Sequence, residues 1–197
     1  MIEALIVTFL SVVFMILLLG GGEVLRRKKI EQGGEAPINK ALFATSKYAI
    51  LVIWGATVLA SWGVGLSILE TSAVITGIAL AFWVAGFAFL FLGRFGLGNS
   101  FRLGTPKEST SLRTAGLYGI SRNPMYLGVY ATVMASALFT MNPLVWALGA
   151  LVVCVHHRIV LAEEEHMRTA FGKEYDEYCR RVGRYIGLRP RAGSAWA

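Results

Sequence analysis

The chain has 197 residues, of which 55% are hydrophobic and 16% are charged, and its formal net charge is +7. The apolar residues are gathered in blocks near the length that crosses a bilayer, which excludes an ordinary soluble domain and indicates an integral membrane protein. Basic residues beside membrane helices set topology and attract anionic headgroups, so the positive charge does not require a nucleic-acid partner, and we expect none.

Five apolar blocks follow one another along the chain. The first three, at residues 2–22, 48–68 and 71–93, are long enough to cross a bilayer. The last two, at residues 125–140 and 144–159, are short, which a thinned bilayer or packing inside a bundle accommodates. We therefore predict an all-α fold: a polytopic membrane helix bundle of about five transmembrane helices in a single domain.

The lysines and arginines orient this bundle. With five crossings, residues 23–47, residues 94–124 and the tail from residue 158 lie on one side of the membrane. They hold all 19 basic residues, whereas the opposite side has only Glu3 and Glu70 at its edges. By the positive-inside rule, the N-terminus lies outside and the C-terminal tail lies in the cytoplasm.

Two polar clusters flank the last two apolar blocks. Residues 122–128 precede the first arm of this hairpin and the three glutamates at 163–165 follow the second, so arms of similar length bring the clusters to the same membrane face. Three consecutive carboxylates spread around a helix axis, so at least one faces the bundle and needs a cationic partner. Arg122 and Arg158 are the nearest candidates.

The first cluster also has a purely structural interpretation. Ser121 or Asn123 can cap the following helix, Pro124 suits its first turn, and Arg122 can reach to lipid headgroups. Residues 122–128 alone do not decide between this interpretation and a site.

The tail carries one further pattern. Phe171, Tyr175, Tyr178 and Val182 recur at helical spacing, with charged residues on the remaining faces. This pattern predicts a cytoplasmic amphipathic C-terminal helix at the membrane interface. Periodicity leaves open whether the helix also closes a site.

Four motifs in this half of the chain occur in a recognisable order. They are Thr-x-Gly-Leu-Tyr at 114–118, Arg-Asn-Pro-Met-Tyr-Leu-Gly at 122–128, Glu-Glu-Glu at 163–165 and Phe-Gly-x-Glu-Tyr-x-x-Tyr at 171–178. Together they resemble the membrane methyltransferases, a superfamily that includes isoprenylcysteine carboxyl methyltransferase and the phospholipid N-methyltransferases. The resemblance covers residues 94–190 and implies a methyltransferase-like cofactor-binding half there. The N-terminal transmembrane helices at 1–93 match the superfamily only in being hydrophobic.

This resemblance implies methyl transfer from S-adenosylmethionine to a lipid or lipophilic small-molecule acceptor at the cytoplasmic face. The acceptor atom would belong to an amine, a carboxylate or a thiol. Because the methyl group is already activated by the positive sulfur, we expect no metal and no nucleophilic side chain. The sequence does not indicate an oligomeric state.

The resemblance also assigns site residues. For the cofactor they are Tyr118, Asn123, Pro124, Tyr126, Gly128 and Glu164. For the chemistry we assign Arg122, which would orient a carboxylate, together with Arg158 and Glu163. Glu163, Glu165 and His157 are candidates, by location alone, for a base that removes the proton of the acceptor. For the acceptor we assign Tyr175 and Tyr178.

Two departures from the superfamily bear on these assignments. Position 123 is Asn where better-known members have His, so acid–base chemistry is not expected there. Arg158 lies five residues before Glu163, which shifts the register of the arginine that accompanies the glutamates. The competing interpretation is a noncatalytic membrane protein, such as a small transporter or an assembly factor, and cofactor binding separates the two.

Overall fold

The computed structural model describes residues 1–27, 36–97 and 111–187, with side chains described throughout these ranges except at 21–27. Its elements are α1 (Ile2–Arg27), α2 (Lys40–Ser61), α3 (Ala73–Leu97), the short 3₁₀ helix η2 (Gly116–Gly119), α4 (Pro124–Thr140), α5 (Pro143–Phe171) and α6 (Lys173–Arg181). By length and composition α1, α2, α3 and α5 can cross a membrane, and α4 is a shorter apolar helix. The all-α membrane bundle is thus confirmed.

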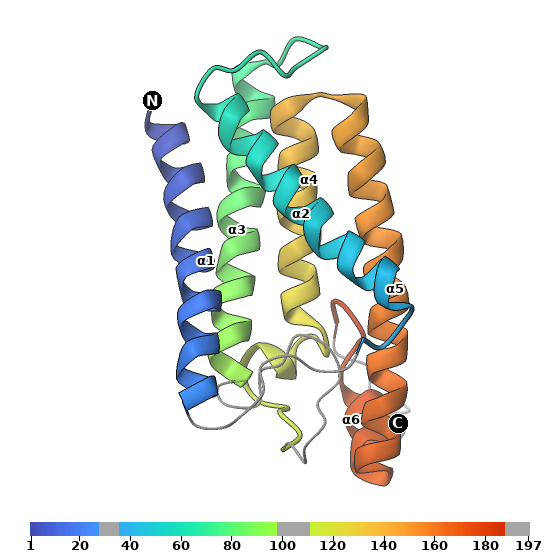
Figure 1. Cartoon of the computed structure of the whole chain (residues 1–197). Helices are drawn as coiled ribbons and strands as arrows, with labels where there is room; N and C mark the ends of the chain where they lie inside the picture. Colours follow the sequence, from blue (N-terminus) through green and yellow to red (C-terminus); the bar gives the residue numbers. More distant parts are fainter. Residues whose placement is uncertain (28–35, 98–110, 188–197) are drawn as a thin grey trace, which may run out of the picture.

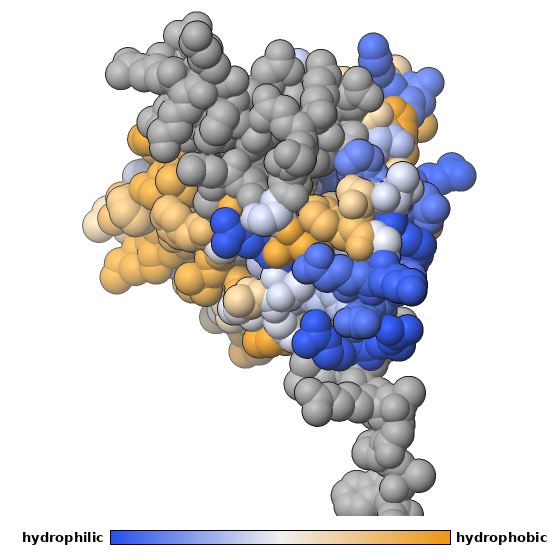
Figure 2. Space-filling model, turned by 90° about the horizontal axis from the view of Figure 1, so that it is seen from below, coloured by the Kyte–Doolittle hydropathy of each residue, from blue (hydrophilic) through white to orange (hydrophobic). Residues whose placement is uncertain are grey.

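The helices run side by side, except that α2 crosses the bundle obliquely (Figure 1). α3 and α4 make the most extensive contact, and α2 packs against both α4 and α5. Seen from the end at which α6 lies (Figure 2), hydrophilic residues gather on the side of α6 and hydrophobic residues on the opposite side. Sidedness in the membrane stays a prediction.

The bounds of α2 differ from the predicted span of residues 48–68. Asn39 caps the helix, because its side-chain oxygen accepts from the backbone N–H of Ala41 at 2.9 Å, so α2 begins at Lys40. The helix ends at Ser61, before Gly63, which has a φ of 86°. The predicted span was therefore wrong at both ends, since hydropathy does not detect a cap or a turn.

α5 is longer than predicted. It continues past residue 159 to Phe171, so the three glutamates are part of the same helix as the apolar block. Gly172, with a φ of 51°, ends it, and α6 follows directly. The predicted amphipathic helix is therefore divided: its first apolar residue ends α5, and the rest lie on or just after α6.

The apolar face of this divided helix packs against protein. Tyr175, Tyr178 and Val182 are buried together, with Leu112 and Met167 packed against them. The stripe predicted for the membrane interface therefore packs α6 against the end of the bundle where the polar clusters meet.

The bundle core contains hydroxyl groups that join helices. The Thr57 hydroxyl of α2 donates to the Ser136 hydroxyl of α4 at 2.7 Å, and the Trp54 indole N–H donates to the Thr132 hydroxyl at 3.1 Å. Both pairs are buried. Polar groups inside a membrane bundle need such partners. These hydrogen bonds therefore account for the polar residues and help to hold α2 against α4.

Candidate active site

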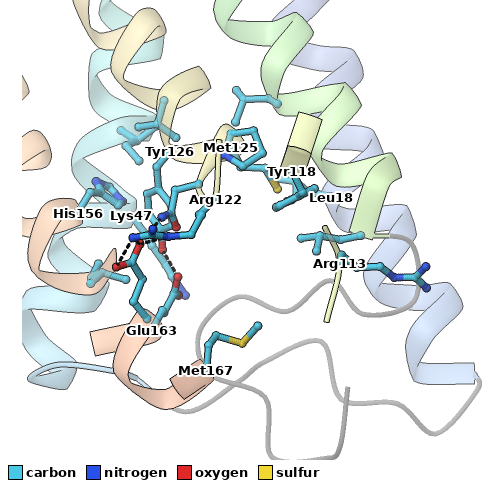
Figure 3. A pocket seen from close by; sticks show the side chains of 18 of the residues that line it. Leu18, Lys47, Arg113, Tyr118, Arg122, Met125, Tyr126, His156, Glu163 and Met167 are labelled. Atoms are coloured by element: carbon cyan, nitrogen blue, oxygen red, sulfur yellow. Dashed lines mark hydrogen bonds and ion pairs between the residues drawn. The ribbon is translucent and has the colours of Figure 1, made fainter. Parts of the chain in front are cut away.

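A cavity of about 520 Å³ lies at the end of the bundle where α6 packs, in the size range of small-molecule sites. Residues from all six α-helices contribute to its wall. Its apolar side includes Phe14, Met15, Leu18, Ile50, Trp54 and Val129. Its polar side includes Lys47, Arg122, Asn123, Tyr126, Glu163 and Glu164. Figure 3 shows Arg122, Tyr126, Lys47 and His156 close together, with Leu18 and Arg113 across the cavity.

Arg122 and Glu164 form the buried ion pair that joins the two polar clusters. The Arg122 Nη2 donates to Oε1 of Glu164 at 2.9 Å and to Oε2 at 3.0 Å, and Nε donates to Oε1 at 3.2 Å. The two side chains are 5% and 6% exposed. Of the two predicted partners for an inward carboxylate, the structure brings Arg122 to Glu164.

Arg122 is also bound to the chain that follows α6. Its Nη1 donates to the carbonyl of Val182 at 2.9 Å and to that of Cys179 at 3.4 Å. With the contacts to Glu164, these hydrogen bonds engage all three guanidinium nitrogens. In this conformation each nitrogen of Arg122 is already bonded to protein.

Glu164 is equally saturated. Besides Arg122, it accepts from Asn123 Nδ2 at 3.0 Å and from Arg184 Nε at 3.0 Å. Sequence reasoning missed Arg184, which follows the helical stripe in a segment without periodicity. A buried carboxylate between several donors is held in one orientation, so Glu164 orders the residues around it.

Of the two glutamates that line the cavity, Glu163 makes fewer hydrogen bonds within the described parts of the chain. Its Oε2 accepts from the Tyr126 hydroxyl at 2.9 Å, and within the described parts of the chain its Oε1 accepts no hydrogen bond. Glu165 instead lies on the surface and pairs with Arg168 at 2.9 Å. The three consecutive glutamates thus have three environments, because successive residues of a helix point about 100° apart.

Lys47 and His156 complete the polar side near Tyr126. The Lys47 Nζ lies 3.8 Å from the centroid of the Phe43 ring. The His156 Nδ1 is 2.9 Å from the carbonyl of Val152, one turn earlier in α5. His156 is therefore bonded within its own helix, whereas the ammonium of Lys47 has a cation–π contact and a coulombic interaction with Glu163.

Two tyrosines that line the cavity donate hydrogen bonds to backbone carbonyls. The Tyr178 hydroxyl donates to the carbonyl of Tyr118 at 2.6 Å, and the Tyr118 hydroxyl donates to the carbonyl of Gly93 at 3.3 Å. Burial raises the pKa of both phenols well above the usual range. Both hydroxyls therefore remain protonated donors at neutral pH.

Most of the predicted site residues line this cavity. They are Tyr118, Arg122, Asn123, Pro124, Tyr126, Glu163, Glu164, Tyr175 and Tyr178. Two predicted residues lie elsewhere. Arg158 is exposed on α5. Gly128 lies where α3 and α4 touch, since a Cβ there would be 2.7 Å from the carbonyl oxygen of Gly86.

Comparison with known proteins adds to this geometry. A family model described as phospholipid methyltransferase matches residues 69–174, which include the Arg122 and Glu163 clusters. A methanethiol S-methyltransferase of Pseudomonas deceptionensis is 29% identical over 186 residues, which cover 87% of this chain and 70% of that protein.

Proposed function

The chain belongs to the phospholipid methyltransferase family, and on this premise we propose that it transfers a methyl group from S-adenosylmethionine to a lipophilic acceptor at the cytoplasmic side of a membrane. One observation carries the proposal: a half-buried carboxylate, Glu163, stands at the polar end of a cavity whose other wall is apolar. Family membership favours an enzyme over the noncatalytic alternative.

The polar end fits the groups of S-adenosylmethionine. Both N–H groups of Asn123 are engaged, by Glu164 and by the carbonyl of Arg184 at 3.2 Å, which leaves its Oδ1 as an acceptor. Oδ1 of Asn123 is thus available to an ammonium or to a ribose hydroxyl, while Oε1 of Glu163 is left for the acceptor. We assign Lys47, in place of Arg122, as the cation that binds the carboxylate of S-adenosylmethionine, because each nitrogen of Arg122 is already bonded to protein.

The apolar wall fits an acceptor that partitions into lipid. Leu19 of α1 and Leu51 of α2 both line the cavity and are exposed on the outer surface of the bundle, at 70% and 44%. The cavity therefore reaches a surface that would face hydrocarbon, and we propose that the acceptor enters between α1 and α2. Because a relative is named for a thiol substrate, a small apolar thiol is the first acceptor to test.

For methyl transfer, the protein mainly has to align the acceptor with S-adenosylmethionine and to deprotonate the acceptor. S-adenosylmethionine supplies a methyl group on a positive sulfur, which makes the methyl carbon electrophilic. A thiol or ammonium acceptor must lose a proton, and Glu163 is the cavity-facing carboxylate that we propose as its base, oriented by the Tyr126 hydroxyl. The apolar wall excludes water from the nucleophile.

Calorimetric titration of S-adenosylmethionine into the detergent-solubilised protein tests the first half of this proposal. The wild type is expected to bind, and a folded wild type that does not bind would overturn the proposal.

Methyl transfer to a small apolar thiol tests the second half. Glu163→Gln is expected to lower the rate constant by about 10²–10⁴-fold, the usual contribution of a general base. Glu165→Gln is the matched control: it changes the same residue type two positions away, on the surface. Equal rate constants for the two variants would show that Glu163 is not the base.

A further inference from the structure

Residues 182–187, here called the C-terminal strap, run past the start of α4. The backbone N–H of Arg122 donates to the carbonyl of Gly183 at 3.0 Å, and Ser121 and Gly183 form an isolated parallel β-bridge. The backbone N–H of Gly183 donates to the carbonyl of Gly187 at 2.7 Å, which closes the strap into a tight turn. The strap therefore has a defined backbone position beside residues 121–123.

Arg184 connects this strap to the buried carboxylate. Its Nε donates to Oε2 of Glu164 at 3.0 Å, while its carbonyl accepts from Asn123 Nδ2 at 3.2 Å and from the Ser121 hydroxyl at 3.4 Å. The Arg184 side chain is 38% exposed, whereas that of Glu164 is 6% exposed. Arg184 thus covers Glu164 from the solvent side and contacts the polar cluster through both its side chain and its backbone.

Tyr185 holds the other side of the strap. Its hydroxyl lies 2.7 Å from Nδ1 of His157 on α5 and 3.3 Å from the hydroxyl of Tyr130 on α4. Its ring packs edge-on against the ring of Tyr130, with centroids 5.6 Å apart. Since these contacts tie the strap to two membrane helices, the strap can stay in place when the side chain of Arg184 is shortened.

The network converges on the amide of Asn123. One of its N–H groups is held by Glu164, which Arg184 orients, and the other by the carbonyl of Arg184. With both N–H groups held, the amide cannot rotate without losing two hydrogen bonds, and its oxygen stays available to the cavity. Arg184 itself is not among the residues that line the cavity.

We propose that Arg184 is a positioning residue for cofactor binding, acting through Glu164 and the Asn123 amide. This inference rests on the proposed function, because the ligand that the Asn123 oxygen receives is S-adenosylmethionine. It also changes the roles inferred for Arg122 and Glu164: they hold the strap and the start of α4 together, and the direct contacts with the cofactor pass to Asn123 and Lys47.

The test is the affinity of the full-length protein in detergent for S-adenosylmethionine and S-adenosylhomocysteine. Arg184→Ala is expected to weaken both by about 10-fold or more, the effect of losing one hydrogen bond to a charged group. Arg180→Ala is the matched control, because Arg180 lies on α6 with its side chain 66% exposed and, among the described residues, is paired only with Glu177 at 3.9 Å. Its affinity should equal that of the wild type.

A double-mutant cycle separates positioning from a general loss of structure. If Arg184 acts through the Asn123 amide, then adding Arg184→Ala to Asn123→Ala should cost little further affinity, whereas a merely structural role would make the two losses additive. Arg184→Lys keeps a charged donor and should recover part of the affinity. It also keeps the inference testable if Arg184→Ala does not fold.

Thermal unfolding of each variant accompanies these titrations. A wild type that binds, together with folded Arg184→Ala and Arg184→Lys variants that bind equally well, would overturn the positioning role and leave the proposed function intact. A folded wild type that binds neither ligand would overturn both.

Discussion

Gly128→Ala is expected to destabilise the bundle at the contact between α3 and α4. A Cβ at this position would lie 2.7 Å from the carbonyl oxygen of Gly86 and 3.0 Å from the backbone nitrogen of Leu90. Because these are backbone atoms, no side-chain rotation can relieve the contact. The two helices must separate by several tenths of an ångström to reach ordinary contact at 3.4 Å.

Overpacking of this kind costs about 1–3 kcal/mol of folding free energy, which for a chain of this length lowers the melting temperature by roughly 2–12 °C. Tyr126 on α4, and Arg122 and Asn123 just before it, lie on the polar side of the cavity, so the affinity for S-adenosylmethionine should fall as well. Both quantities can be measured on purified protein in detergent, by thermal unfolding and by calorimetry.

Gly77→Ala is the matched control. Gly77 lies in α3, the helix that Gly128 of α4 packs against, but nothing is within 4 Å of a Cβ built there. Alanine is favoured over glycine inside a helix by about 0.5–1 kcal/mol, so this variant should melt at or slightly above the wild-type temperature. Equal melting temperatures for Gly128→Ala and Gly77→Ala would refute the close-packing argument.

Three further substitutions test the contacts that hold the site, each by unfolding in detergent. Glu164→Gln removes the buried charge between two arginines and should cost about 3–5 kcal/mol, whereas the surface variant Glu165→Gln should cost less than ~1 kcal/mol; similar losses for both would contradict the buried pair. Tyr178→Phe leaves the carbonyl of Tyr118 without its 2.6 Å partner and should cost about 1–3 kcal/mol, with Tyr48→Phe, exposed at 69%, as a neutral control. Thr57→Val removes the bond to Ser136 and should cost about 0.6 kcal/mol; no loss would mean that this bond does not stabilise the contact between α2 and α4.

The sequence determined the class and the membrane-crossing blocks, because the cost of placing charge in hydrocarbon limits where polar residues can lie. It also brought Arg122 close to the glutamate run, since two apolar arms of similar length must return to the same face. The ends of the helices were harder to predict from the sequence. α2 begins at a capping asparagine and α5 continues through charged residues to Gly172, and hydropathy detects neither.

Only the tertiary structure decided which environment each of the three glutamates occupies. Glu163, Glu164 and Glu165 are identical in type and consecutive, so composition and spacing cannot distinguish them. Their angular positions on α5, set by how the helix is rotated against α4 and the C-terminal strap, place one in the cavity, one in a buried ion pair and one on the surface.

The same holds for Arg184. It comes after the helical pattern has ended, and only the turn of the strap at Gly183 brings it to Glu164. Local sequence patterns report the environment along one helix, whereas a hydrogen bond between residues far apart in the chain depends on the packing of every element between them.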